Sequence, residues 1–246
     1  MRKVPTVLDG PPLFRAASFL LYHGLAIPVL WIVGWLVYGM RVKGRRRFRG
    51  HRRGMIAANH CQYLEPGLEA VALWPRRILF SAEENNVVRR DVGWLTRLLR
   101  TIGIPDDNPL SVGGLIKTGL EKDWFVNFYP EGTISWRAQE PGPFMVGVFF
   151  FAYVNDVPVF PVAEILKERP LRRLLPWWPP RTAFVVCDPV HPRDFRIEGA
   201  SRRERIHRMA DAVRERILDA IEAEGGCRTL PERREPDDPD KAVLRD

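Results

Sequence analysis

The stretch GMIAANHCQYLEP, residues 54–66, runs from small and apolar residues into a histidine and then a glutamate. Its opening apolar run predicts a short buried β-strand over 54–58, followed by a turn that carries His60. A second stretch, WFVNFYPEGTIS at residues 124–135, has the same form: a strand expected over 124–128 delivers Glu131 at its carboxyl end. Functional residues of parallel sheets collect at the carboxyl ends of the strands. We therefore expect His60 and Glu131 to lie at one edge of a sheet.

The rest of the chain alternates short apolar runs with segments of helical periodicity. Further strands are expected over 77–81, 157–162 and 182–186, and helices over 64–74, 92–101, 111–119 and 201–224. This alternation predicts the α/β class, with a mainly parallel sheet covered by helices on both faces. The last helix opens with Ser201 and Glu204 as a capping box, and its apolar side should pack against the sheet.

His60 and Glu65 form a candidate catalytic pair. An imidazole removes a proton from a hydroxyl near neutral pH only if it is neutral, in the right tautomer and held still. A carboxylate on its other ring nitrogen supplies all three conditions. The spacing of five residues brings the two side chains together through a helical turn before Pro66 or through a strand-to-helix turn. Taken alone, such a histidine is more often a helix cap or a partner of buried backbone groups.

Three blocks of the chain resemble the lysophosphatidic acid acyltransferase family of glycerolipid acyltransferases. The family's first block reads N-H-x-x-x-x-D-P, and here Asn59-His60 and Glu65-Pro66 flank four residues. Its third block, F-P-E-G-T-R-S, corresponds to YPEGTIS at 129–135, and its fourth, V-P-[IV]-x-P-V, to VPVFPV at 157–162. The blocks occur in the family's order, and the likeness runs from about residue 16 to about residue 194.

The resemblance implies an O-acyltransferase. It would move a fatty acyl chain directly, without a covalent acyl-enzyme, from acyl-CoA or acyl-carrier protein to the free hydroxyl of a lysolipid such as 1-acylglycerol-3-phosphate or another lysophospholipid. It also implies no metal and no redox cofactor. His60 would be the general base and Glu65 its orienting partner. Glu131 would bind the acceptor, or would accept backbone hydrogen bonds as a turn residue, and backbone N–H groups near Gly132 and Thr133 would hold the oxyanion or the acceptor.

Three departures from the family pattern bear on the acceptor. Glu65 replaces the usual Asp, a change also known in the related lipid A acyltransferases. Ile134 stands where the third block has Arg, and residues 103–108, in the place of the second block, contain no Arg. In the family these arginines are taken to hold the acceptor's phosphate. The acceptor could therefore be a lysophospholipid with a larger head group or a lyso-aminolipid. Arg137, Arg89 or Arg90 are candidates to replace the missing side chains.

Two other functions fit the same chain. The missing arginines and Glu65 are compatible with a catalytically silent membrane lipid-binding protein of this fold, although the retained His60 argues against decay. A hydrolase of thioesters or lipid esters would use water in place of the acceptor. The absence of a G-x-S-x-G motif excludes the commonest lipase design.

An apolar segment near the N-terminus predicts contact with a lipid bilayer. Residues 16–40 contain no Asp, Glu, Lys or Arg. A helix of this length crosses a hydrocarbon layer of roughly 30 Å. His23, Pro28 and the glycines suit equally a kinked helical hairpin that lies in one leaflet, so both arrangements are open. A cleaved signal peptide is disfavoured, because the run leads into arginines without a small-residue cleavage site.

The chain's net charge of +8 comes from one place. Residues 41–53 hold eight Lys and Arg and no acid, and the remaining 30 basic residues balance the 30 acidic ones. A basic cluster beside an apolar segment favours the cytoplasmic side and attracts anionic head groups, at about 1 kcal/mol per residue. The alternative is a signal that only sets the orientation of the segment, with no direct contact to lipid. The catalytic stretch would then face the cytosol beside the membrane. Nucleic-acid binding is not expected, because no nucleic-acid module accompanies the cluster.

Length and composition indicate one large folded domain with two flanking segments. With 246 residues and 46% hydrophobic content, we divide the chain into a membrane-anchoring segment (1–53), an α/β acyltransferase domain (54–226) and a disordered tail (227–246).

The three cysteines, Cys61, Cys187 and Cys227, form no disulfide or zinc pattern and indicate a reducing compartment. Paired tryptophans in the 175–180 loop suit the membrane interface and a packed position equally.

Overall fold

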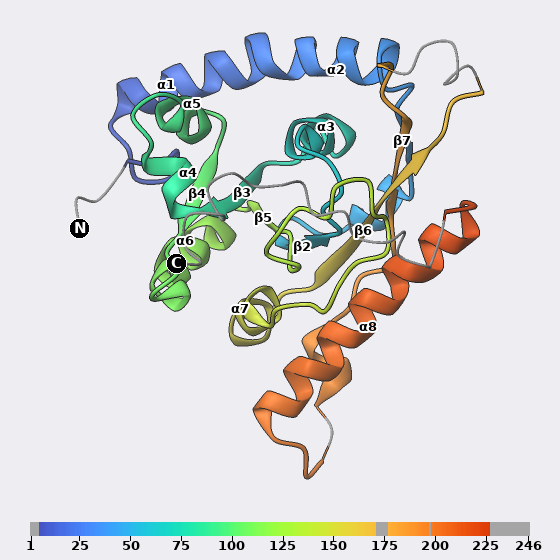
Figure 1. Cartoon of the computed structure of the whole chain (residues 1–246). Coiled ribbons are helices and arrows are strands. Elements are labelled where there is room, and N and C mark those ends of the chain that lie inside the picture. The colour runs from blue at the N-terminus through green and yellow to red at the C-terminus, as the bar shows by residue number, and fades with distance from the viewer. Residues whose placement is uncertain (1–4, 171–176, 197, 227–246) are drawn as a thin grey trace, which may run out of the picture.

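A seven-stranded sheet forms the centre of the molecule (Figure 1). The computed structural model describes residues 5–170, 177–196 and 198–226. The strands lie in the order β1-β7-β6-β2-β5-β3-β4, and the pairs from β6 to β4 are parallel, whereas β7 is antiparallel to β6. The strands are β1 (Arg41–Lys43), β2 (Gly54–Ala58), β3 (Ile78–Glu83), β4 (Thr101–Ile104), β5 (Phe125–Phe128), β6 (Val159–Lys167) and β7 (Arg181–Val186). The mainly parallel α/β fold predicted from the sequence is confirmed.

Helices cover both faces of this sheet. One apolar cluster joins the strands to α6, α7 and α8, and a second joins the opposite face to α3 and to residues of the N-terminal helix. Figure 1 shows these two layers, with α3 on one side of the sheet and α7 and α8 on the other. The helices are α3 (Glu65–Ala72), α4 (Glu84–Val88), α5 (Gly93–Leu98), α6 (Gly113–Glu121), α7 (Gly147–Asn155) and α8 (Arg202–Ala223). Single-turn 3-10 segments such as η2 (Arg45–Phe48) connect them.

Several elements follow directly from local sequence signals. Strand β2 occupies the residues predicted for it, and α8 begins where the capping box indicates, with Oγ of Ser201 accepting a hydrogen bond from Glu204 N. Strand β1 was not predicted, because it lies inside the basic run and shows no apolar pattern. Its pairing of Arg41 with Ala183 adds residues 41–43 to the sheet, although the sequence placed them in the membrane-anchoring segment.

The apolar N-terminal segment is one continuous helix. It comprises α1 (Pro12–Phe19), a π-helical turn η1 (Leu20–Ala26) and α2 (Ile27–Leu36). The kinked hairpin left open by the sequence is therefore not what forms. Glycines allow close packing where α2 crosses α3: a Cβ on Gly67 would lie 3.0 Å from Leu30, and one on Gly34 would lie 3.3 Å from Leu68. The helix consequently lies along the domain, against α3 and α5 (Figure 1).

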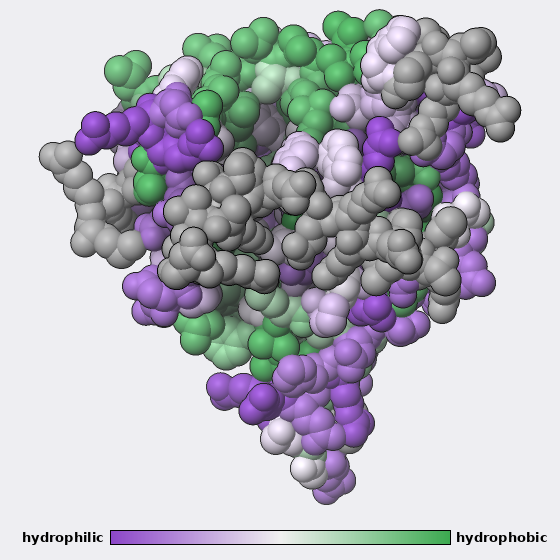
Figure 2. All heavy atoms as spheres, in the orientation of Figure 1, coloured by the Kyte–Doolittle hydropathy of each residue, from purple (hydrophilic) through white to green (hydrophobic). Residues whose placement is uncertain are grey.

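The outer side of this helix is an exposed apolar surface. Figure 2 shows the hydrophobic colour along the top of the molecule, over α1 and α2. By length and composition the helix from residue 12 to residue 36 is able to cross a membrane, and only 11% of its most apolar window is buried. The helix surface is formed by Leu20, Leu25, Val29, Trp31, Ile32 and Trp35.

The tryptophan loop lies at the end of α2. The indole of Trp178 donates to the backbone oxygen of Val37 at 2.8 Å, whereas Trp177 is 77% exposed. Trp178 is thus held to the end of α2 by a hydrogen bond, although 38% of its surface is exposed, and contact of either tryptophan with a bilayer stays a prediction. Residues 175 and 176 of that loop, and the predicted tail 227–246, lie outside the described residues.

Candidate active site

His60 and Glu65 lie on the turn that joins β2 to α3. Strand β2 ends at Ala58 and α3 begins at Glu65, so the strand-to-helix turn brings the pair together. Nδ1 of His60 lies 3.1 Å from Oε2 of Glu65, and the Glu65 side chain is fully buried. The same oxygen accepts hydrogen bonds from the backbone N–H groups of Cys61 and Gln62 at 2.9 and 3.3 Å. The carboxylate therefore fixes the turn and the imidazole together.

The surroundings of His60 keep its ring neutral. The ring is 15% exposed and stacks on Tyr129, with centroids 4.2 Å apart. Burial lowers the pKa of His60 to about 4, in spite of the opposing influence of Glu131 and Glu164. With Nδ1 engaged by Glu65, Nε2 is the nitrogen left for a hydroxyl. A neutral, oriented imidazole of this kind meets the requirements for a general base.

Glu131 connects the second stretch to the first. Its Oε1 accepts from His60 N at 2.9 Å, and its Oε2 accepts from Gly142 N at 3.0 Å and from the Ser135 hydroxyl at 3.4 Å. Burial raises the pKa of Glu131, while these donors and His60 oppose the rise. The contacts are those of a turn residue that accepts backbone hydrogen bonds. Binding of an acceptor by Glu131 stays a prediction.

Gly132 and Thr133 form the tip of the same turn. Gly132 has φ of +74° and donates its N–H to Tyr129 O at 3.0 Å. Glycine adopts this left-handed conformation without steric cost. Thr133 is exposed, and among the described residues its N–H has no hydrogen-bond acceptor. Of the two predicted backbone donors, only the one at Thr133 is free for a substrate oxygen.

The three arginines considered as replacements lie in different settings. Arg137 N donates to Cys61 O at 2.8 Å, which places Arg137 beside the His60 turn. Its guanidinium lies 5.8 Å from the ring centroid of Trp136, which in turn contacts the exposed Tyr63. Arg89 forms an exposed ion pair with Asp91, and Arg90 is exposed on the same segment. Of these three arginines, only Arg137 is joined by a backbone hydrogen bond to the His60 turn.

Buried polar residues behind the pair were not predicted. Glu69, Glu164 and Gln62 have at most 5% of their surface exposed, and Glu69 accepts from Tyr129 Oη at 2.8 Å and from Asn127 Nδ2 at 3.1 Å. Burial raises the pKa of Glu69 to about 8. The sequence carried a signal for Glu164: it is an acid inside an otherwise apolar strand. Such a residue is buried only with hydrogen-bond partners.

The hydrogen bonds around Cys61, Glu65 and Glu164 do not suit a metal ion. Ligand atoms of Cys61, Glu65 and Glu164 lie within 4.8 Å of one another. N–H donors, however, already point at the same carboxylates: the Cys61 amide at Glu65, and the Gln62 side chain at Glu164. A cation in that position would face these donors, so we do not treat the three residues as ligands. Burial also raises the pKa of the Cys61 thiol, which is unfavourable for a nucleophile.

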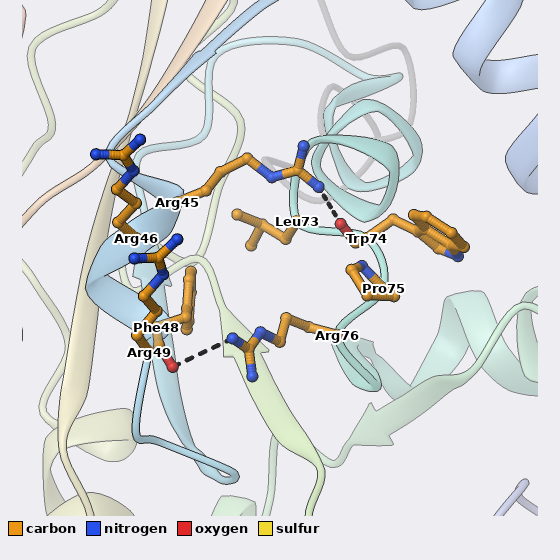
Figure 3. A pocket seen from close by; sticks show the side chains of 8 residues that line it. All are labelled: Arg45, Arg46, Phe48, Arg49, Leu73, Trp74, Pro75 and Arg76. Atoms are coloured by element: carbon orange, nitrogen blue, oxygen red, sulfur yellow. Dashed lines mark hydrogen bonds between the residues drawn. The ribbon is translucent and has the colours of Figure 1, made fainter.

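A separate cleft lies at the other end of the sheet. It has a volume of about 260 Å³ and is lined by four arginines around Phe48 and Trp74 (Figure 3). Its residues precede β2 and β3, whereas His60 follows β2, so the cleft opens at the amino ends of the strands. The arginine side chains hold the cleft's own backbone: Arg45 donates to Trp74 O and Arg76 to Phe48 O. The cleft is not part of the His60 site.

Comparison with known proteins identifies the family. The family model described as "Acyltransferase" matches residues 39–164, more than half of the chain. The chain belongs to the Acyltransferase family. The match contains the whole His60 turn, Glu131 and Glu164. The resemblance found in the sequence motifs is thereby confirmed at the level of the family.

A solved structure shares the fold of this acyltransferase. The crystal structure of the 1-acyl-sn-glycerophosphate acyltransferase PlsC from Thermotoga maritima superposes with a TM-score of 0.54 and 18% sequence identity. The alignment covers 85% of this chain and 95% of that one. The two chains thus share their overall fold. A comparison with curated proteins gave no match.

The conformation of Gly132 gives a test of the turn. We expect Gly132→Ala to lower the free energy of unfolding by about 1–2 kcal/mol, because a side chain at positive φ is strained and a Cβ there would collide with Met145. Gly147→Ala is the matched control, since nothing lies within 4 Å of a Cβ at that helical position. Urea denaturation of both variants measures the difference. Equal stabilities would contradict the role given to Gly132.

Proposed function

We propose that this acyltransferase is a membrane-associated O-acyltransferase that transfers a fatty acyl chain from acyl-CoA or acyl-carrier protein to the free hydroxyl of a lysolipid. The observation that carries the proposal is the buried Glu65 carboxylate 3.1 Å from Nδ1 of a neutral His60. The pair lies at the carboxyl ends of parallel strands, where sites of this fold class occur. The family membership supports acyl transfer, and the resemblance of the motifs supports a lysophospholipid such as 1-acylglycerol-3-phosphate.

The proposed reaction needs only one proton shuttle. Nε2 of His60 takes the proton from the acceptor hydroxyl while that oxygen attacks the thioester carbonyl carbon. Glu65 stabilises the imidazolium that results. The free N–H of Thr133 donates to the oxyanion of the tetrahedral intermediate. When the intermediate collapses, the carbon–sulfur bond breaks, and the thiolate leaves with the proton held by His60. No metal or redox cofactor enters the scheme.

The proposed acceptor site uses Arg137 for the phosphate. Ile134 cannot form a charge-assisted hydrogen bond, and Arg89 is already paired with Asp91. Arg137 lies next to the His60 turn through its backbone bond to Cys61 O. Its guanidinium provides the fork of donors that suits a phosphate. Glu131 then acts on the acceptor indirectly, by holding the backbone of His60.

The proposed site of action is the cytoplasmic face of a membrane. The helix surface defined by Leu20, Leu25, Val29, Trp31, Ile32 and Trp35 is apolar and exposed, and Trp177 extends beside its end. Because the helix packs along α3, it suits a position in one leaflet better than a span across the bilayer. The arginines after it favour the cytoplasmic side.

Removal of the proposed base is the first test. We expect His60→Ala to lower kcat by about 10²- to 10⁴-fold, the range for loss of a general base. Wild type, His60→Ala and the exposed control His207→Ala are incubated with labelled acyl-CoA or acyl-carrier protein and a panel of lysolipids, and products are resolved by mass. If wild type transfers to no acceptor yet binds lipid, the catalytically silent protein becomes the better description. Release of free fatty acid alone would indicate the hydrolase.

The pH dependence follows from the state of His60. Its pKa lies near 4, so the neutral, active form persists as the pH falls below neutral. We expect kcat to hold from neutral pH into the mildly acidic range and to fall only as the pH approaches that value. A half-maximal rate near the ordinary histidine pKa of about 6.5 would contradict the burial argument.

Arg137 is tested by comparing acceptors. We expect Arg137→Ala to raise KM for a lysophosphatidic acid by about 10- to 100-fold, as loss of a hydrogen bond to a charged group predicts. KM for an uncharged monoacylglycerol should not change. Arg89→Ala serves as the matched control. An equal loss for both acceptors would assign Arg137 a structural role in the turn.

The helix surface is tested by vesicle binding. We expect the double substitution Trp31→Glu and Trp35→Glu to weaken flotation with phosphatidylglycerol vesicles by about tenfold or more, because each large apolar side chain contributes about 2 kcal/mol on burial. Val154→Glu is the control, since Val154 is exposed on α7 at the other face of the sheet. Binding that survives the double substitution would exclude this surface as the anchor.

A further inference from the structure

A second carboxyl group lies behind the His60–Glu65 pair. Glu164 is in the middle of β6 with none of its surface exposed, and its carboxyl lies within 4.8 Å of that of Glu65. Two carboxylates this close do not both ionise in an interior without water, because each charge disfavours the other. One proton is therefore expected on the pair.

The hydrogen bonds decide which group holds that proton. Oε2 of Glu65 accepts from the backbone N–H groups of Cys61 and Gln62 and lies 3.1 Å from Nδ1 of His60, whereas its Oε1 is buried and has no hydrogen-bond partner. Glu164 accepts from the side-chain amide of Gln62 and from Sγ of Cys61, a weaker donor, at 3.2 Å. Burial raises the pKa of both carboxyls, but the hydrogen bonds from Cys61, Gln62 and Glu164 oppose the rise at Glu65, whereas the contact with Glu65 adds to the rise at Glu164. This difference favours the anion on Glu65. A proton on Glu164, directed at Glu65 Oε1, would satisfy the one oxygen that is left.

We propose that Glu164 is a neutral carboxylic acid that donates a hydrogen bond to Oε1 of Glu65 and so acts as a positioning residue for His60. The inference rests on the acyltransferase function proposed above. Glu65 then keeps its charge and holds the proton of His60 on Nδ1, which leaves Nε2 free to accept the proton of the hydroxyl. Glu164 acts on the reaction only through Glu65.

The main chain around Glu164 is built to hold it in place. Oδ1 of Asn59 accepts from Glu164 N at 2.7 Å, and Nδ2 of Asn59 donates to Glu164 O at 3.0 Å. Nε2 of Gln62, which contacts the carboxyl, also donates to the Thr182 hydroxyl at 3.2 Å. Asn59 precedes His60 directly, so the turn and the buried acid are fixed to each other. The longer Glu65, in place of the usual Asp, thus has a second carboxyl that restrains it.

The groups that face Glu164 favour its neutral form. They come from the segment before β1, the His60 turn, α3 and the end of β5: Tyr38, His60, Cys61, Glu65, Glu69 and Tyr129. Burial, followed by the neighbouring Glu65, raises the pKa of Glu164. Burial raises the pKa of Glu69 to about 8, which favours the neutral form of this neighbour as well.

Two substitutions of Glu164 test whether it acts as a neutral hydrogen-bond donor or as a negative charge. Glu164→Gln keeps a donor for Glu65 and an acceptor for Gln62, so we expect wild-type KM, kcat and acid limb of the pH profile. Glu164→Leu removes the donor. We expect it to lower kcat by about 100-fold with KM unchanged. Its acid limb, which follows protonation of His60, should move up by about one to two pH units, because Glu65 without that hydrogen bond stabilises the imidazolium of His60 more strongly.

An ionised Glu164 predicts the opposite shift of the acid limb. If Glu164 were ionised, both substitutions would remove a negative charge beside Glu65, and the acid limb would move to lower pH in both. That result would overturn the proposal. A kcat for Glu164→Gln as low as that for Glu164→Leu would overturn it as well, because the amide retains the donor.

An infrared measurement tests the proton without any enzyme assay. Wild type at neutral pH should show a protonated-carboxyl carbonyl band that is lost in Glu164→Gln, with Glu69→Gln as the matched control that removes a different band. If Glu164→Gln loses the band but the wild-type protein transfers no acyl chain, the proton is on Glu164 as proposed and the acyltransferase function is rejected. An unchanged carboxyl spectrum in Glu164→Gln, from an active enzyme, would reject the placement of the proton alone. This measurement uses the near-isosteric variant, so it remains decisive if Glu164→Leu does not fold.

Discussion

The His60 turn depends on a fully buried carboxyl group. Burial raises the pKa of Glu65, and the backbone N–H groups of Cys61 and Gln62, which point at one of its oxygens beside Nδ1 of His60, oppose that rise. A buried carboxylate without such donors takes up a proton instead. The shape of the turn and the orientation of the imidazole therefore follow from the same set of hydrogen bonds. The first residue of α3 organises the loop that comes before it.

The two motif stretches meet because their strands are neighbours. Strands β2 and β5 are paired in parallel, with Ala57 opposite Phe128, so the turns that follow them emerge at the same edge. Glu131 then bonds to His60 N, and Ser135 and Arg137 bond to the carbonyls of His60 and Cys61. The second stretch thus supports the backbone of the first. A residue can be essential to the site through this support without touching a substrate.

Helix packing also connects the apolar helix to the His60 turn. Helix α2 lies on α3 through the close contacts at Gly34 and Gly67, and α3 begins with Glu65. In the proposed function, the element that contacts the bilayer is therefore packed against the helix that orients the base. A lipid acceptor would reach His60 from the membrane side without leaving the interface. This arrangement gives the glycines of the crossing a role in placing the site near its substrate.

The local signals in the sequence were sufficient for the fold class, for strand β2, for the cap of α8 and for the His60–Glu65 pair. These features depend on periodicity, on capping chemistry or on short spacing, which a single sequence displays. Tertiary structure decided four other features: strand β1, the continuous N-terminal helix, the backbone contacts of Glu131 and the placement of Glu164. Glu164 is 99 residues from Glu65 along the chain, and the two meet only because β6 pairs with β2. Long-range pairing creates the buried environment that determines protonation, and no local pattern of residues specifies that environment.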